Sequence, residues 1–172
     1  MKALLVCCFF FLVCFTQVQS YVYLEDEYNA SLQAWQALNS KAYTYVVVTT
    51  YENSVGRTTI KVRNGQVVSR TYVEKNTFDY PGNVVKSWSE TTPATLGSHE
   101  GYPPVLTMDE LYEYCHDNIL TSDENPADQD PQYPENYARF FTDSNGLISY
   151  CAFYHDLSFS ANILNVGSIR YC

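Results

Sequence analysis

The chain has 172 residues, with 19 Asp and Glu against ten Lys and Arg, so its formal net charge at pH 7 is −9. This acidity argues against nucleic acid and anionic membranes as partners. It favours cations, basic proteins or mineral surfaces, although acidity also keeps secreted proteins soluble. The 16 Tyr residues are typical of half-buried sheet faces and interfaces, and they would also permit oxidative cross-linking in an extracellular matrix.

The first twenty residues have the pattern of a secretory signal peptide. Lys2 precedes an unbroken apolar run from Ala3 to Phe15, and Val18 and Ser20 complete a cleavage pattern. Thirteen apolar residues are too few to span a bilayer as a helix. The sequence therefore predicts cleavage after Ser20 and a single secreted domain over residues 21–172, which is long enough to bury a core of its own.

Three of the six Cys residues lie in the predicted signal peptide, which leaves Cys115, Cys151 and Cys172. In an oxidising compartment three thiols predict one bridge and one remaining Cys. We expect Cys151 and Cys172 to pair, because both lie in predicted neighbouring strands. Cys115 lies on the apolar face of a predicted helix, so it would stay reduced or link two chains into an oligomer. Asn29, in the sequon Asn29-Ala30-Ser31, is a candidate glycosylation site within another predicted helix.

The amino-terminal part of the predicted domain begins with an amphipathic helix. Apolar residues recur at spacings of three and four from Leu24 to Leu38, and acidic residues occupy the first turn. Asn64-Gly65, between two alternating segments, is a strong β-hairpin signal. The pattern predicts an antiparallel meander of three strands, at residues 42–51, 57–63 and 66–75.

The rest of the chain alternates irregular segments with regular ones. Residues 76–104 are rich in Pro, Gly, Ser and Thr and predict a long loop, with room for a short strand near Val84 and Trp88. Thr107 and Glu110 form a capping box that predicts a helix to about Leu120. After this helix the sequence predicts a polar loop at 121–136, a hairpin around 143–146 and a short last strand at 167–172. The expected fold is α+β, an antiparallel sheet of five to six strands with two helices packed on one face.

An acidic segment suggests a weak calcium site. Between Asp117 and Ala138 there are six acidic residues and no Lys or Arg, and carboxylate oxygens are the ligands that calcium prefers. The segment lacks the Gly and the closing Glu of a calcium-binding hand, so we expect only low affinity; the alternative is a solvated acidic loop. The candidate ligands are Asp123, Glu124, Asp128 and Asp130.

Catalytic motifs are not apparent in the sequence, and we expect neither an enzyme nor a bound cofactor. Cys151 and His155 are four residues apart on a predicted strand, which separates them by about 13 Å, too far for a nucleophile and its base. Cys115 and His116 are adjacent on a helix and point about 100° apart, so one metal cannot easily use both. No glycine-rich phosphate loop or Ser-centred elbow occurs.

Several short motifs between Gln33 and Tyr154 resemble those of one protein family. They are Trp35, the hairpin with Asn64-Gly65-Gln66-Val67, the helix start Thr107-Met108-Asp109-Glu110-Leu111-Tyr112 and the hairpin Asp143–Ser149. Together they resemble a family of small secreted or lipoprotein α+β domains of unknown function. The resemblance implies an α+β fold and no catalytic residues. The family carries a Gly-Tyr-Pro after a late strand, whereas here Gly101-Tyr102-Pro103 precedes the second helix.

These features favour an acidic, Tyr-rich, non-enzymatic protein that acts by surface contact outside the cell. The first hypothesis is a constituent of an extracellular matrix, in a mineralised or tyrosine-cross-linked material. The alternative is a soluble binding or inhibitor module that presents the loops 76–104 and 121–136 to a protein partner. A hydrolase without a recognisable motif is the third.

Overall fold

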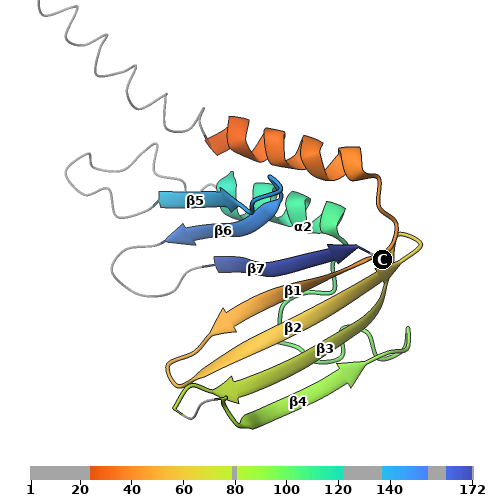
Figure 1. Cartoon of the computed structure of the whole chain (residues 1–172), viewed down its shortest axis with the longest axis vertical. Coiled ribbons are helices and arrows are strands. Elements are labelled where there is room, and N and C mark those ends of the chain that lie inside the picture. The colour runs from red at the N-terminus through yellow and green to blue at the C-terminus, as the bar shows by residue number, and fades with distance from the viewer. Residues whose placement is uncertain (1–23, 79–80, 122–136, 155–161, 172) are drawn as a thin grey trace, which may run out of the picture.

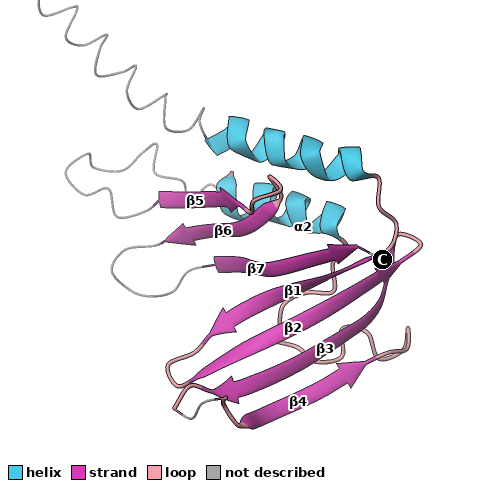
Figure 2. Ribbon diagram, in the orientation of Figure 1, coloured by secondary structure: helices cyan, strands magenta, loops and turns pink. Residues whose placement is uncertain are grey.

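The computed structural model describes residues 24–78, 81–121, 137–154 and 162–171. They form an α+β fold in which helices cover one face of a single antiparallel sheet (Figures 1 and 2). The sheet has seven strands in the order β4-β3-β2-β1-β7-β6-β5, so the expected count of five to six was too low. The strands are β1 (Tyr43–Thr50), β2 (Ser54–Arg63), β3 (Gln66–Asn76), β4 (Val84–Glu90), β5 (Tyr137–Thr142), β6 (Ile148–Tyr154) and β7 (Asn162–Tyr171).

The first described helix, at residues 24–38, lies across the end of the sheet formed by β5, β6, β7 and β1 (Figure 1). Tyr28, Ser31 and Trp35 are its buried residues, at the expected helical spacing. The Trp35 ring packs edge-on against Tyr43 of β1, with ring centroids 4.9 Å apart. Leu38, expected on the apolar face, is largely exposed, so the buried stripe ends one turn earlier than the sequence pattern indicates.

The second helix, α2 (Met108–Cys115), begins at the predicted capping box. The Glu110 amide donates to the Thr107 side chain, and the Thr107 amide donates to the Glu110 carboxylate. After Cys115 the helix continues as one π-helical turn (His116–Leu120), which ends where the Thr121 amide donates to the His116 carbonyl over 2.9 Å. The helix therefore extends to Leu120, as predicted, but its last turn is wider.

Strands β1, β2 and β3 form the expected meander. The β2–β3 turn places Asn64 and Gly65 at φ 52° and 73°, the left-handed conformation that Asn-Gly favours. Alternate residues of β1 and β2 are buried, so one face of the sheet carries the core and the other does not. We call the uncovered side the open face.

Strand β7 is longer than expected and joins the two parts of the sheet. Its first half pairs with β6 and its second half pairs with β1. The β1–β7 register shifts by one residue beside Val47, which leaves Gly167 as the extra residue of a bulge. A Cβ atom at Gly167 would lie 2.8 Å from Cγ2 of Val48, so the close approach of these two strands requires Gly here.

The disulfide joins Cys115 to Cys151, so the expected Cys151–Cys172 bridge and the expected free Cys115 were both wrong. Cys115 lies on the buried face of α2, which packs directly over Cys151 of β6. In the β6–β7 register the residue opposite Cys151 is Leu164, and the far end of β7, Tyr171, pairs with Tyr43 of β1. Cys172 lies outside the described residues, and Cys115 cannot link two chains while this bridge is intact.

Residues 76–104 are not the long free loop that the sequence suggested. They contain β4, followed by an irregular segment at residues 91–106, here called the arm, that folds back over β3 and β4. The Arg70 side chain donates to the carbonyls of His99 and Pro103 in the arm. Trp88, expected in a surface loop, stacks on Tyr72 and on His99, with ring centroids 5.4 and 4.1 Å away.

A buried ion pair connects the arm to the sheet. Arg70 of β3 and Glu90 of β4 are 2% and 0% exposed. Two Arg70 nitrogens donate to the two Glu90 oxygens over 2.9 and 2.8 Å. The Glu90 carboxylate also accepts the backbone amides of Gly97 and His99. Every oxygen of this buried carboxylate is thus satisfied, as a charge without access to water requires.

Candidate functional site

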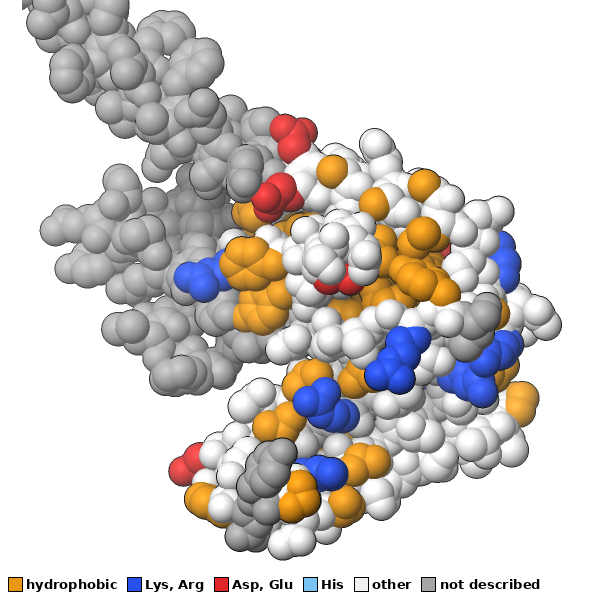
Figure 3. Space-filling model, in the orientation of Figure 1, with side chains coloured by type: hydrophobic (Ala, Val, Ile, Leu, Met, Phe, Trp, Pro, Cys, Tyr) orange, Lys and Arg blue, Asp and Glu red, His pale blue; other side chains and the backbone are white. Residues whose placement is uncertain are grey.

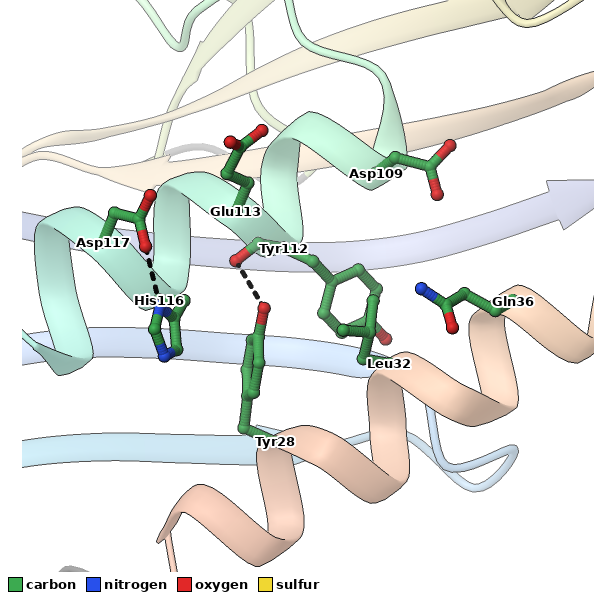
Figure 4. A pocket seen from close by; sticks show the side chains of 8 residues that line it. All are labelled: Tyr28, Leu32, Gln36, Asp109, Tyr112, Glu113, His116 and Asp117. Carbon is green, nitrogen blue, oxygen red and sulfur yellow. Dashed lines mark hydrogen bonds and ion pairs between the residues drawn. The ribbon is translucent and has the colours of Figure 1, made fainter.

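A groove opens between the first helix and α2, on the side of the molecule away from the sheet (Figure 4). It has a volume of about 290 Å³, and we call it the interhelical groove. Its side chains include exposed carboxylates of α2 and two rings, Tyr28 and Tyr112, that belong to the buried faces of the helices. The lining residues are Tyr28, Leu32, Gln36, Asp109, Tyr112, Glu113, His116 and Asp117.

Three carboxylates follow one side of the groove. Asp109, Glu113 and Asp117 are four residues apart along α2 and its π-helical turn, which places them in one row. The Trp35 indole donates to Oδ1 of Asp109 over 2.8 Å and fixes the first carboxylate. His116 Nδ1 lies 2.7 Å from Oδ1 of Asp117.

The facing helix adds further negative charge. Oε1 of Glu25 lies 3.8 Å from His116 Nε2, so this imidazole lies between two carboxylates. No Lys or Arg occurs in residues 24–38 or 107–121. We call these two segments together the helix layer. Its acidic residues are Glu25, Asp26, Glu27, Asp109, Glu110, Glu113 and Asp117.

The floor of the groove is aromatic and fixed by hydrogen bonds. The Tyr28 hydroxyl donates to the Tyr112 carbonyl over 3.2 Å (Figure 4), and the Tyr112 hydroxyl lies 2.8 Å from the Ser31 hydroxyl and accepts the Ile148 amide. Burial, reinforced by the negative charges of Asp117 and Glu25, raises the pKa of Tyr28 to about 12.

The chemistry of the groove suits binding of a positive group. Its carboxylates are exposed, apart from their contacts to Trp35 and His116, and no Ser, Thr or Cys lines it. Among the described residues no three His, Cys, Asp or Glu side chains are grouped closely enough to hold a metal ion. An ammonium or guanidinium group can instead contact the exposed carboxylates of the row.

The residues that the sequence singled out are widely separated. The expected calcium ligands Asp123, Glu124, Asp128 and Asp130 lie outside the described residues, as do His155 and Asp156. Asn29 is exposed on the first helix, and its side-chain amide donates to Glu25 over 3.2 Å. Cys115 is buried in the bridge while His116 faces the groove, so the prediction that these neighbours point apart is confirmed.

Sequence reasoning did not identify the groove. Asp109, Glu113 and Asp117 are spaced four residues apart in the sequence, which places them on one side of a helix. The sequence does not reveal the position of the first helix. That helix lies beside the carboxylate row, so the row becomes one wall of a groove. The only sequence signal was the lack of any Lys or Arg in both helices, since surface helices usually mix both signs of charge.

Comparisons of the chain with protein-family models, with curated proteins and with solved structures give no match. Within the described residues no helix is both long enough and apolar enough to span a bilayer. The case for a function therefore depends on the groove, the sheet and their charges.

Proposed function

We propose that this protein is a secreted, non-enzymatic constituent of an extracellular matrix that binds cationic partners through the helix layer. The observation that carries the proposal is the interhelical groove, where three exposed carboxylates line the α2 side and neither helix contains Lys or Arg. Such a site recognises Lys and Arg side chains of neighbouring matrix proteins. The preference is electrostatic, so it selects charge and spacing rather than one sequence.

The fold supports contact through fixed surfaces. The groove walls are held by the Cys115–Cys151 bridge, by the capping box and by the Trp35 contact to Asp109. A preformed wall loses little conformational entropy on binding. The content of 16 Tyr residues supports a role in a cross-linked material, since exposed phenols such as Tyr51 and Tyr171 can be coupled oxidatively.

The alternative, a soluble inhibitor module that presents two long loops, has less support. Most of residues 76–104 belongs to β4 or to the arm, and Arg70 and Glu90 fasten the arm to the sheet. Weak calcium association through the acidic segment at residues 121–136 is compatible with either function and stays a prediction.

Isothermal titration of the mature protein with short Lys-rich and Arg-rich peptides tests the groove. We expect binding that weakens as salt increases and that is lost in the variant Asp109→Asn/Glu113→Gln/Asp117→Asn. The control Glu52→Gln/Glu100→Gln removes two exposed carboxylates elsewhere on the chain and should bind like the native protein. Equal loss in both variants would show a general effect of net charge and would reject the groove as the site.

Differential extraction of the native tissue tests the matrix location. A matrix constituent should stay in the residue after mild aqueous extraction and be released by high salt or by a chelator. Complete recovery as a monomer in the first aqueous extract would instead favour the soluble module.

A further inference from the structure

The open face of the sheet has the opposite charge to the rest of the protein. Arg57 and Lys61 of β2 and Arg170 of β7 point to this side, because their neighbours Thr58, Ile60 and Ile169 point to the core. Both Lys61 and Arg170 pair with Thr44 of β1, so they lie on either side of one central strand. Figure 3 shows Lys and Arg side chains distributed over this side of the molecule.

Acidic residues are missing from the same face. The described strands contain only two, Glu74 and Glu90, and both point to the covered side, where Glu74 accepts the Tyr72 hydroxyl. Among the described residues Arg57, Lys61 and Arg170 have no acidic partner. Within the described strands, the charged side chains of the open face are therefore basic, and they lie opposite the acidic helix layer.

We propose that the open face is a docking surface for the helix layer of a second copy of this chain. Charge complementarity is the reason for choosing this occupant: each molecule presents a basic sheet face on one side and an acidic, groove-bearing layer on the other. The exposed Arg and Lys side chains supply the cationic groups that the carboxylate row accepts. The inference depends on the proposed function in one respect, because the helix layer takes part in both.

This contact uses two different surfaces on opposite sides of the molecule, so it joins copies head to tail. A head-to-tail interface that is not ring-closing produces an open chain of subunits. Each copy that docks exposes a new basic face and a new acidic layer at the ends of the assembly. An extended assembly of this kind is what a matrix constituent requires.

Ionic strength should have two opposing effects on the assembly. The net charge of −9 makes copies repel one another at about 0.01 M salt, where the Debye length is about 30 Å. At about 0.1 M the long-range repulsion is screened while close pairs still attract, and at about 1 M the close pairs are weakened too. Self-association should thus be strongest near about 0.1 M and weak in absolute terms, with a dissociation constant on the order of 10⁻⁴ M.

Charge-reversal variants test the pairing of the two faces by sedimentation velocity. The sheet variant is Arg57→Glu/Lys61→Glu/Arg170→Glu, and the helix variant is Asp26→Lys/Glu113→Lys/Asp117→Lys. These six residues are exposed, and the substitutions leave the capping box and the Trp35 contact intact. Each variant alone should sediment as a monomer, whereas an equimolar mixture should associate, because the native helix layer of the sheet variant can dock on the native open face of the helix variant.

A combined variant with all six reversals has the native net charge and exchanges the signs of the reversed positions, which can pair again, so it should recover association. The control Lys41→Glu/Glu52→Lys alters neither face and should also behave like the native protein. A native protein that stays monomeric at all salt concentrations, or variants that associate as well as it does, would overturn the proposal. Either result would leave peptide binding in the groove untouched, so failure here is distinct from failure of the proposed function.

Discussion

The two halves of the covered sheet face are buried by different means. Over β5, β6, β7 and β1 lie two helices, an apolar core and the disulfide. Over β3 and β4 lies the arm, and the side chains facing it include Arg70, Tyr72, Trp88 and Glu90. The helix half is held by hydrophobic burial, which is non-directional, while the arm half is held by directional hydrogen bonds and ring stacking. Loss of a single polar group should therefore destabilise the arm half strongly. The helix half should instead respond mainly to changes in buried side-chain volume.

The largest expected effect is at Arg70. Arg70→Met leaves the Glu90 carboxylate buried without its cation and removes the donor to His99 and Pro103, which should lower the free energy of unfolding by about 3–5 kcal/mol. Urea denaturation is the measurement. The double variant Arg70→Met/Glu90→Leu removes both charges and should recover much of the loss. A mild effect of Arg70→Met would mean that water reaches Glu90 and that the arm is only loosely attached.

In the helix half, the change comparable to Arg70→Met is removal of the Cys115–Cys151 disulfide. The cysteines are 36 residues apart in sequence, so Cys115→Ala/Cys151→Ala should cost about 4 kcal/mol through the gain in unfolded-state entropy. Cys172→Ser is the control and should leave the stability close to that of the native protein. Peptide mapping without reduction should recover a Cys115–Cys151 peptide, and a Cys151–Cys172 peptide would contradict the structure.

Each half contains one of the two Trp residues, which allows a direct comparison. Trp35 is 3% exposed, so Trp35→Ala should cost about 2–5 kcal/mol, as should Leu111→Ala in α2. Trp88→Ala should cost less, about 1–3 kcal/mol, because the ring is partly exposed. Trp88→Phe keeps the stacking and removes an indole N–H that has no partner among the described residues, so it should be nearly neutral. Equal loss in Trp88→Phe and Trp88→Ala would show that the indole nitrogen is bonded.

The sequence predicted the helix half well because that half obeys simple periodicities. The helix at residues 24–38, the capping box of α2 and the last hairpin are local patterns of this half, and each is confirmed. The Asn64-Gly65 turn between β2 and β3 is a local pattern too and is also confirmed. The arm half was missed because its Pro and Gly content indicates a loop, and no local pattern reports that Arg70 and Glu90 face each other. The disulfide was wrong for a similar reason, since it depends on where α2 crosses β6.

The candidate site was predictable only in part. The charge and spacing of the acidic residues along α2 can be predicted from the sequence. The groove also requires the first helix beside α2, and that placement is set by long-range contacts such as Tyr28 to Tyr112. The basic open face could also be predicted in part, because Lys61 lies between the apolar residues Ile60 and Val62. Its proposed role as a docking surface depends on the acidic helix layer on the opposite side, and that arrangement is a property of the whole fold.

The two halves should also respond differently to pH. Their stability should change gradually with pH, and this is the smallest of the expected effects near neutrality. The Arg70 guanidinium, with the amides of Gly97 and His99, holds the pKa of Glu90 well below its usual 4.5. A lowered pKa gives stability that is present above about pH 4.5 and is lost as the pH falls below it. Acid should therefore loosen the arm half first.

Alkali should act through the buried tyrosines. The pKa of Tyr28 is raised to about 12, and burial raises those of Tyr43 and Tyr112. The stability that depends on these neutral phenols is complete below about pH 10 and is lost as the pH rises toward 12. Tyr72 has a raised pKa as well, so alkali should affect both halves, whereas acid should distinguish them.

The two Trp residues make this distinction measurable. In the variant Trp35→Phe the fluorescence reports on Trp88 alone, and in Trp88→Phe it reports on Trp35 alone. As the pH falls below about 4.5 the Trp88 signal should change before the Trp35 signal, since only Trp88 stacks within the cluster that depends on ionised Glu90. Coincident transitions would show that the two halves unfold as one unit, and the ion pair would then stabilise the whole domain rather than the arm.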